Sequence, residues 1–427
     1  MYDWANSAYG TTIVAAVLPT YFADVVARGE SIRIGSLTVS PTTAWAFVIA
    51  LSSFIAFACA PVLGAIADFS GAKKRFLLVF AYGGALFSML LFFCGPGDVH
   101  LTLFLFLLAQ VGFIGSLVFY DAFVTDVASV SEMDSISSKG YSYGYIGGGL
   151  QFGLSLALIA GHDYAGISTT TAARIAILTA GLWWAGFSLF TVKYLSETHR
   201  SQRLPNKYHG WPRLVAYAAV GVSRTLETTR RVGRYRHLVL FLIAFMLYND
   251  GIQTVIDIAT IYGSQELKLP IAALMVTLLI IQIIAAVGAM IFSWIAAKIG
   301  SKRAIMISLV LWSGVVIYAY FMTTAAEFFG LGVIVGIVLG GSQALSRSFY
   351  GSMVPAEASA EFFGFYTVFS KFSAIWGPTA FGLIDHLAGS SRLAILSLIF
   401  FFICGLVLMA FVDEQKARQA RESAAFG

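Results

Sequence analysis

Two long apolar runs meet at the stretch Gly64-Ala65-Ile66-Ala67-Asp68-Phe69-Ser70-Gly71-Ala72-Lys73-Lys74-Arg75. Its glycines permit a tight turn and close approach of the backbone, and Asp68 lies just inside the apolar boundary. The basic cluster at the end of the stretch marks the cytoplasmic side of a membrane. The stretch therefore predicts a short cytoplasmic turn between two membrane-spanning helices.

A weaker copy of this stretch spans Ser293 to Arg303. It keeps Gly300 and the following basic residues at matching spacing, but Ala297 takes the place of Asp68. The two copies occupy matching places in the two halves of a 427-residue chain. The sequence thus predicts two related membrane halves in tandem, an arrangement typical of secondary transporters.

The composition places the chain in a membrane. Hydrophobic residues make up 58% of the sequence and charged residues 11%, whereas soluble domains contain roughly 25% charged residues. Apolar stretches of roughly 20 residues are long enough to cross a bilayer. We predict an all-α integral membrane protein with twelve transmembrane helices in two six-helix bundles. The predicted spans are 3–27, 42–68, 76–95, 101–127, 139–162, 172–195, 238–262, 270–297, 304–323, 327–349, 362–388 and 391–412.

The basic residues predict the orientation. With a cytoplasmic N-terminus, most of the 27 Lys and Arg residues fall in or beside cytoplasmic loops or the C-terminal tail. We therefore expect a multi-pass protein of an inner or plasma membrane with both termini in the cytoplasm. The net charge of +5 reflects this topology, so we expect no nucleic-acid partner.

Four regions are predicted along the chain. They are an N-terminal six-helix bundle (1–195), a cytoplasmic basic linker with an amphipathic helix (196–237), a C-terminal six-helix bundle (238–412) and a cytoplasmic tail (413–427). In the linker, apolar residues recur at helical spacing from Trp211 to Leu226. The linker helix is either an anchor on the membrane surface or a regulatory site for a lipid or protein.

No motif for covalent or ATP-driven chemistry is present. The sequence contains no G-x-x-x-x-G-K-[ST], nucleophile elbow or H-E-x-x-H, and its six His residues show no metal-ligand spacing. Each of the three cysteines lies in a different span, so we expect neither a disulfide nor a metal framework. We predict a protein that is not an enzyme and has no metal site and no cofactor.

Charges within the predicted spans are costly, at roughly 3 kcal/mol each near the bilayer centre, and they mark functional sites. Lys371 lies in the middle of the eleventh span and Asp250 at similar depth in the seventh, with Asp257 two turns later. A carboxylate in an apolar cavity takes up and releases a proton as its access to solvent alternates. The candidates for proton coupling are Asp121, Asp250 and Asp257. A buried pair of Lys371 with Asp250 could equally be structural.

Residues nearer the membrane surface are gate candidates. Asp68 and Asp126 are interpreted as latch or helix-end groups. For Arg347, near the inner end of the tenth span, the alternatives in order are an ion pair with Asp126, contact with an anionic substrate, and snorkelling to the interface.

The Gly64–Arg75 stretch resembles the cytoplasmic loop signature of the major facilitator superfamily, and four further strings narrow the resemblance to its vacuole-effluxer branch. These strings are Tyr2-Asp3-Trp4-Ala5-Asn6-Ser7-Ala8, Tyr248-Asn249-Asp250-Gly251-Ile252-Gln253-Thr254, Gly340-Gly341-Ser342-Gln343-Ala344-Leu345-Ser346-Arg347-Ser348, and Glu361-Phe362-Phe363-Gly364-Phe365-Tyr366 leading to Lys371 and Gly377-Pro378. The resemblance covers nearly the whole chain. Eukaryotic members of this branch are associated with amino-acid export from vacuoles.

The resemblance implies two bundles around a central cavity that opens alternately to either side. The residues that it implies around the substrate are Asn6, Asp121, Asn249, Asp250, Gln253, Gln343 and Lys371. It also implies gate roles for Asp68, Gly71 and Arg75. Because the second copy of the loop lacks its Asp, we expect an asymmetric gate. Asp121 follows Tyr120 where we expected an Asn, a difference that affects coupling or the charge of the substrate.

The leading hypothesis is a secondary active transporter that moves a small polar solute, an amino acid among the candidates, with protons and by alternating access. Its expected partners are the solute, protons and membrane lipids, and it is expected to act as a monomer. The alternatives are a non-transporting membrane sensor or scaffold that retains the fold, and an uncoupled channel or lipid scramblase.

Overall fold

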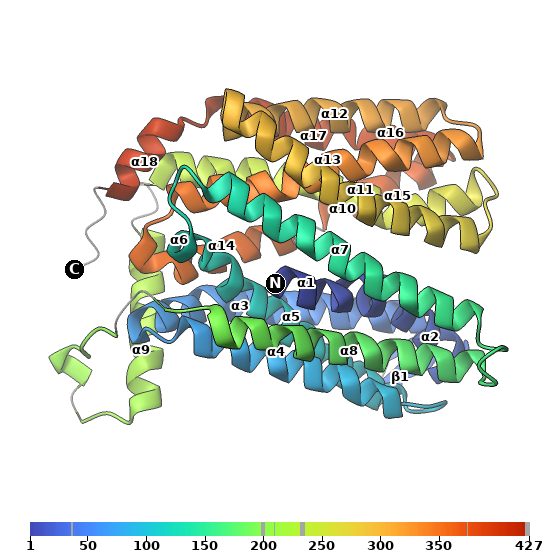
Figure 1. The fold of residues 1–427 in the computed structure, drawn as a ribbon, viewed down its shortest axis with the longest axis horizontal. Coiled ribbons are helices and arrows are strands. Elements are labelled where there is room, and N and C mark those ends of the chain that lie inside the picture. The colour runs from blue at the N-terminus through green and yellow to red at the C-terminus, as the bar shows by residue number, and fades with distance from the viewer. Residues whose placement is uncertain (36, 198–200, 209, 231–234, 374, 423–427) are drawn as a thin grey trace. The chain divides into compact units, whose positions relative to one another are not determined.

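The computed structural model describes residues 1–35, 37–197, 201–208, 210–230, 235–373 and 375–422, and these residues are helical almost throughout (Figure 1). Their strands form an antiparallel hairpin, in which β1 (Ile32–Ile34) pairs with β2 (Leu37–Val39) and Ile32 lies opposite Val39. The predicted all-α class is confirmed.

The first half of the chain begins with one apolar segment in which α-helical and π-helical turns alternate. Its pieces are α1 (Tyr2–Ala8), the π-helical η1 (Tyr9–Val17), α2 (Leu18–Tyr21) and the π-helical η2 (Phe22–Val26). The helices that follow are α3 (Pro41–Ser70), α4 (Lys73–Leu90), the 3-10 turn η3 (Leu91–Phe93), α5 (Val99–Ala122), α6 (Val124–Val127), α7 (Met133–Ala160) and α8 (Thr169–Tyr194).

The linker contains the 3-10 turn η4 (Asn206–Tyr208) and α9 (Arg213–Arg230), which covers the predicted amphipathic helix. The second half contains α10 (Arg236–Gln265), α11 (Ile271–Ile299), α12 (Ser301–Phe321), α13 (Ala325–Met353), the 3-10 turn η6 (Ala356–Ala358), α14 (Ser359–Phe372), α15 (Trp376–Ala388), α16 (Ser391–Ser397) and α17 (Ile399–Phe411). In the predicted tail, α18 runs over Glu414–Glu422, and residues 423–427 lie outside the described residues.

Eleven helical segments of the described chain are long and apolar enough to cross a membrane. They correspond to every predicted span except the eleventh, 362–388. In that region the chain forms two shorter helices, α14 and α15, so the count of twelve continuous spanning helices is not confirmed.

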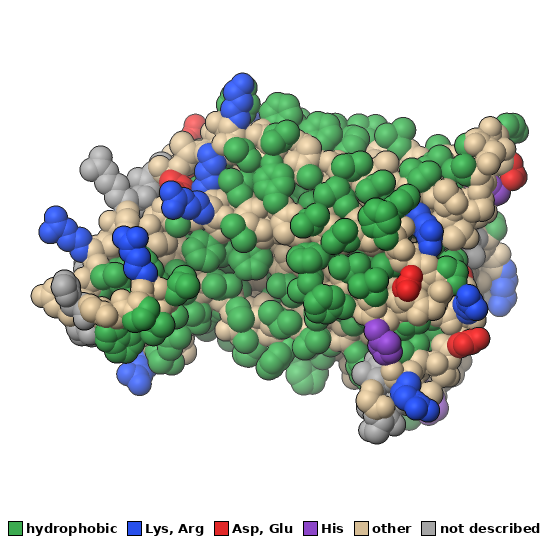
Figure 2. Space-filling model, turned by 90° about the horizontal axis from the view of Figure 1, so that it is seen from below, with side chains coloured by type: hydrophobic (Ala, Val, Ile, Leu, Met, Phe, Trp, Pro, Cys, Tyr) green, Lys and Arg blue, Asp and Glu red, His purple; other side chains and the backbone are tan. Residues whose placement is uncertain are grey.

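Large apolar side chains cover the face of the molecule drawn in Figure 2, and charged side chains gather toward its ends. Phe54, Leu154 and Phe400 are each more than 60% exposed. Soluble proteins rarely expose such large apolar areas, so this surface matches a lipid environment.

Contacts divide the chain into two compact units. Unit 1 consists of Met1–Ala60, Gly71–Tyr120 and Tyr143–Arg200, and unit 2 of Pro61–Ser70, Asp121–Ser142 and Ser201–Gly427. In unit 1, α4 and α1 pack against α8. In unit 2, α11 packs along α13, and α17 packs against α10 and α12 (Figure 1). The division predicted at 195 and 238 stays a prediction.

The two copies of the loop form equivalent turns. Gly71 and Gly300 both adopt a positive φ, 58° and 88°, which strains any residue with a Cβ. Just after each turn a lysine amino group caps the carbonyl end of the last apolar helix of its half. Lys74 donates to Val192 and Leu195 at 2.7 and 2.6 Å, and Lys302 donates to Ala410 and Val412 at 2.8 and 2.7 Å. This shared contact supports the internal repeat.

Glycines allow the backbones of α11 and α13 to touch. A Cβ at Gly340 would lie 2.0 Å from the carbonyl oxygen of Ala285, and one at Gly288 would lie 2.3 Å from that of Ile337. Such small-residue contacts are how helices associate closely in a membrane.

Replacing Gly340 by Ala should therefore lower the stability of the protein by about 1–3 kcal/mol, because the added methyl group forces the two backbones apart. Gly330→Ala, in the same helix, is the matched control: a Cβ there meets open space, and Ala is a better helix former than Gly by about 1 kcal/mol. Thermal unfolding in detergent micelles measures both variants. Equal shifts in the two melting temperatures would contradict the close packing.

Candidate functional site

Asp68 lies at the end of α3 and caps the N-terminus of α14. The carboxylate is 5% exposed, and its two oxygens accept hydrogen bonds from the backbone N–H groups of Ala360 at 3.2 Å and Glu361 at 2.9 Å. These N–H groups are the second and third of the helix, the donors that an N-cap side chain normally satisfies. The residue at the N-cap position itself, Ala358, provides no side-chain hydrogen bond. A carboxylate from another helix therefore supplies the cap.

Gly64 makes this approach possible. It lies one helical turn before Asp68, and a Cβ on it would come within 2.2 Å of the carbonyl oxygen of Ala360. Gly71 forms the turn after α3, and Arg75 lies exposed in the first turn of α4. Of the predicted gate residues in the loop, Asp68 is thus the one that the structure places directly on α14.

Arg347 of α13 holds a second cluster in unit 2. Its guanidinium is almost fully buried and forms an ion pair with Asp121 at 3.0 Å. It also donates to the hydroxyl and the carbonyl of Ser137, both at 2.9 Å, and lies 4.3 Å from the centre of the Tyr141 ring. Among the three roles considered for Arg347, an ion pair is the one observed, and the partner is Asp121. The role of Asp126 stays a prediction.

Asp134, in the first turn of α7, was not among the predicted residues. Its carboxylate accepts hydrogen bonds from the hydroxyls of Ser301 and Ser348, both at 2.5 Å. Ser301 directly follows Gly300 in the second copy of the loop, the copy that lacks an Asp. An acid near a helix start usually interacts with that helix end, so no sequence pattern connects Asp134 with that loop.

Two neighbouring polar residues of α10, Asp250 and Asn249, form hydrogen bonds with the two parts of the predicted eleventh span. Asp250 is 1% exposed, and its Oδ1 accepts a hydrogen bond from the backbone N–H of Gly377 at 2.8 Å, in the first turn of α15. The neighbouring Asn249 donates to the hydroxyl of Ser373 at 2.5 Å, just after α14 ends. Gly377 must be a glycine here, because a Cβ would lie 2.0 Å from the hydroxyl oxygen of Thr254.

The second oxygen of Asp250, Oδ2, has no hydrogen-bond partner among the described residues. A buried carboxylate oxygen in this condition is costly when charged. Asp250 therefore combines a structural contact, through Oδ1, with an oxygen that is available to a proton.

Lys371 and Asp257 carry opposite charges on two helices that contact each other, α14 and α10. Lys371 is half-buried near the end of α14, and Asp257 is exposed on α10. The hypothesis that Lys371 and Asp250 act together stays a prediction, and Asp257, two turns further along α10, offers a second carboxylate. Gln253 on α10 and Gln343 on α13 are half-buried in the same unit.

In unit 1, Asn6 is buried on α1, and its side-chain nitrogen has no hydrogen-bond partner within the described chain. The π-helical η1 follows directly. Its Tyr9 donates to Gln110 at 3.0 Å and its Thr12 donates to Gln151. π-Helical turns often occur at functional sites, and these polar pairs mark the interior face of η1.

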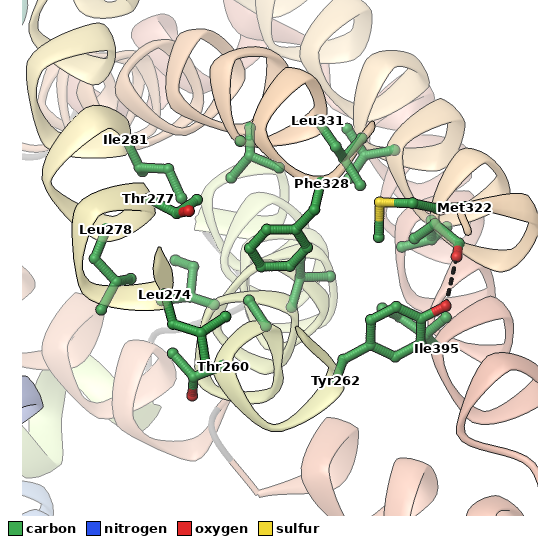
Figure 3. Close-up of a pocket in the computed structure, with 18 residues that line it drawn as sticks. Thr260, Tyr262, Leu274, Thr277, Leu278, Ile281, Met322, Phe328, Leu331 and Ile395 are labelled. Atoms are coloured by element: carbon green, nitrogen blue, oxygen red, sulfur yellow. Dashed lines mark hydrogen bonds between the residues drawn. The ribbon is translucent and has the colours of Figure 1, made fainter. Parts of the chain in front are cut away.

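An apolar cavity of about 70 Å³ lies between α10, α11, α12 and α13 (Figure 3). Phe328 and Leu274 line it, and the hydroxyl of Tyr262 donates to the carbonyl of Ala319 at 2.7 Å. The lining is mostly apolar, and neither Asp250 nor Asp257 belongs to it. The cavity therefore does not provide the groups that a polar solute needs, and the candidate site is the polar face of α10 with α14 and α15.

Comparison with known proteins agrees with this architecture. A family model described as "Vacuole effluxer Atg22 like" matches residues 1–422. The chain is 34% identical over 417 residues to an uncharacterized MFS-type transporter, YxiO, of Bacillus subtilis (strain 168), a match that covers 97% of the chain and 94% of the relative. It is 27% identical over 437 residues to autophagy-related protein 22 of Coccidioides immitis (strain RS), covering 85% of the chain and 71% of the relative.

Among solved structures, the major facilitator superfamily transporter FucP in the outward conformation superposes with a TM-score of 0.67. The match covers 96% of the chain and 97% of FucP, at 13% sequence identity. At this identity the likeness shows the fold alone, which is the predicted major facilitator fold.

Breaking the Arg347–Asp121 pair from one side should be more harmful than removing both charges. Arg347→Gln leaves the carboxylate of Asp121 largely buried without its cation, and we expect a loss of about 3 kcal/mol in stability. Arg347→Gln combined with Asp121→Asn should recover part of that loss. Unfolding of the two single variants and the double variant in detergent measures the coupling, and strictly additive losses would contradict a direct ion pair.

Proposed function

Because the chain belongs to the Atg22-like vacuole effluxer family of MFS-type transporters, we propose that this secondary transporter moves a small zwitterionic solute, first of all an amino acid, together with protons. The observation that carries the proposal is the presence of an ammonium group and carboxylates, Lys371, Asp257 and Asp250, on the neighbouring helices α14 and α10. A zwitterion offers the complementary pair of charges. Charged groups in such surroundings are expensive and are retained for function.

In the proposed binding step, the two charged groups of the solute bind Lys371 and Asp257. The carboxylate of the solute binds Lys371 and its ammonium binds Asp257, so that each charge of the solute meets an opposite charge. Asn249, Gln253 and Gln343 are proposed to supply neutral hydrogen bonds, and the substrate role of Asn6 in unit 1 stays a prediction. This assignment supersedes the expectation that the ammonium meets Asp250 or Asp121, because those carboxylates are engaged by Gly377 and Arg347.

The proposed proton carrier is Asp250. Protonation at Oδ2 neutralises a buried charge without removing the oxygen that holds Gly377. A carboxyl group in this position changes its protonation when its access to solvent changes, which is what coupling to alternating access requires. Asp121 and Asp257 are proposed as further groups in the coupling, through Arg347 and Lys371 respectively.

The proposed gate consists of the contacts of Asp68 with α14, of Arg347 with Asp121, and of Asp134 with Ser301 and Ser348. Gly71, Arg75 and Asp126 are proposed to shape its edges. We propose that this gate lies on the cytoplasmic side, together with both termini, because Lys and Arg are enriched in cytoplasmic loops. Loss of Asp68 would then slow switching and affect binding less.

The alternative is a sensor or scaffold that binds a solute without moving it, with α9 as its output. The packing of α9 against α3 favours this alternative: a Cβ at Gly221 would lie 2.9 Å from the carbonyl oxygen of Val62. Binding without flux would indicate a sensor, whereas coupled flux excludes it.

The test is reconstitution into proteoliposomes, with proton movement recorded as amino acids are added one at a time and protein-free liposomes as the control. The proposal predicts a saturable, solute-dependent proton signal for one class of amino acid. A folded protein that gives no signal across the whole panel contradicts the proposed substrate class. A solute flux that leaves the proton signal unchanged contradicts the coupling.

Lys371→Ala should abolish the saturable signal while leaving the protein folded. The reason is the loss of a charge-assisted contact with the solute carboxylate, worth about 1.5–3 kcal/mol or roughly ten- to hundredfold in affinity. Lys139→Ala is the matched control, because Lys139 is exposed on α7. Normal transport by the Lys371 variant would overturn its assignment to the site.

A further inference from the structure

Glu361 is the third residue of α14, and its side chain takes no part in the contact of that helix with Asp68. The residue is fully buried, and neither carboxyl oxygen completes a hydrogen bond with any described residue. A glutamate at this position of a helix commonly bonds back to the N-cap N–H. Here that N–H, from Ala358, already donates to the carbonyl of Pro355.

The groups that face Glu361 are mostly unsuited to balance a negative charge. They are Asp68 from α3, Arg224, Glu227 and Thr228 from α9, and Tyr350 from α13. Tyr350 donates its hydroxyl proton to the carbonyl of Phe362 at 2.7 Å. Arg224 donates to Gln202 at 3.1 Å and lies 5.8 Å from the centre of the Phe69 ring. Among the described groups of this set, the cation is therefore shared, while the carboxylates of Asp68 and Glu227 disfavour a further negative charge on Glu361.

Two acids lie at the N-terminus of α14, Glu361 of that helix and Asp68 of α3. The surroundings stabilise the ionised form of Asp68. It accepts two backbone hydrogen bonds at the positive end of a helix, and both stabilise its ionised form. Glu361 has neither, and burial next to a like charge favours the neutral form of a carboxyl group. The packed arrangement thus holds one proton on Glu361.

We propose that Glu361 is a proton-dependent latch on the contact between α3 and α14: protonated Glu361 allows Asp68 to remain seated on α14, and loss of the proton unseats it. This latch is distinct from the transport function, but its role in gating rests on the proposed function. If the Asp68 contact is part of the cytoplasmic gate, the latch makes opening of that gate sensitive to cytoplasmic pH.

The direction of the pH effect follows from linkage. The packed state binds one more proton than a state in which Glu361 meets water, so the stabilisation is complete below the ordinary pKa of a glutamate, about 4.3. It is lost progressively as pH rises toward the pKa of Glu361 in the packed state. Within that window the equilibrium constant for opening increases by up to about tenfold for each pH unit.

Hydrogen–deuterium exchange of the full chain in lipid nanodiscs tests the latch without any transport assay. The readout is the exchange rate of peptides from α14, divided at each pH by the rate of the same peptide in unfolded protein. Measurements between about pH 5 and about pH 8 keep Asp68 ionised. In the unchanged protein, exchange at the start of α14 should accelerate by up to about tenfold per pH unit over part of this range.

Glu361→Gln keeps the shape of the protonated side chain and cannot lose a proton. Its α14 peptides should match those of the unchanged protein at the lowest pH and stay protected as pH rises. Glu227→Gln, which neutralises an exposed acid of α9, should retain the acceleration. A pH profile of Glu361→Gln that follows that of the unchanged protein, or no acceleration in the unchanged protein, would overturn the latch. Because exchange does not depend on a solute, failure of the latch is distinguishable from failure of the proposed transport.

Discussion

A carboxylate from another helix caps the N-terminus of each piece of the divided eleventh segment. Asp68 of α3 takes the first N–H groups of α14, and Asp250 of α10 takes that of Gly377 in α15. Neither helix has a side-chain cap of its own, because Ala358 and Ile375 stand at the N-cap positions. In an apolar surrounding, unsatisfied N–H groups cost several kcal/mol. A division of this segment into two helices is therefore tolerable only while both carboxylates stay in place.

The segment formed by α14 and α15 therefore contacts both the proposed gate, at Asp68, and the proposed coupling site, at Asp250. Movement of α14 relative to α3 exposes the N–H groups that Asp68 satisfies, and movement of α15 relative to α10 does the same at Asp250. Lys371 lies on the piece between them, near the end of α14. Discontinuous helices whose ends bind charged groups are a recurring device of secondary transporters. Movement of this segment therefore breaks hydrogen bonds at both carboxylates.

The sequence was sufficient for the helical class and for eleven of the twelve predicted membrane segments, because these depend on composition. The sequence was not sufficient to predict which side chains contact each other. Asp250 and Asp257 lie two turns apart on one face of α10, so spacing alone cannot decide which of them faces Lys371. Asp134 and Glu361 were missed because an acid in the first turn of a helix commonly stabilises the N-terminus of its own helix. The division after α14 was signalled only weakly, by Gly377-Pro378, since Pro is tolerated in the first turn of a helix.

The central claim is that Asp250 serves both as a cap and as a proton carrier. Asn is as good a cap as Asp but does not titrate, so Asp250→Asn separates the two roles. The most direct measurement is solute uptake into proteoliposomes under an imposed pH gradient, compared with solute exchange at equal pH on both sides. Our account predicts that Asp250→Asn keeps exchange and loses uptake driven by the gradient. Gradient-driven uptake at the level of the unchanged protein would contradict it.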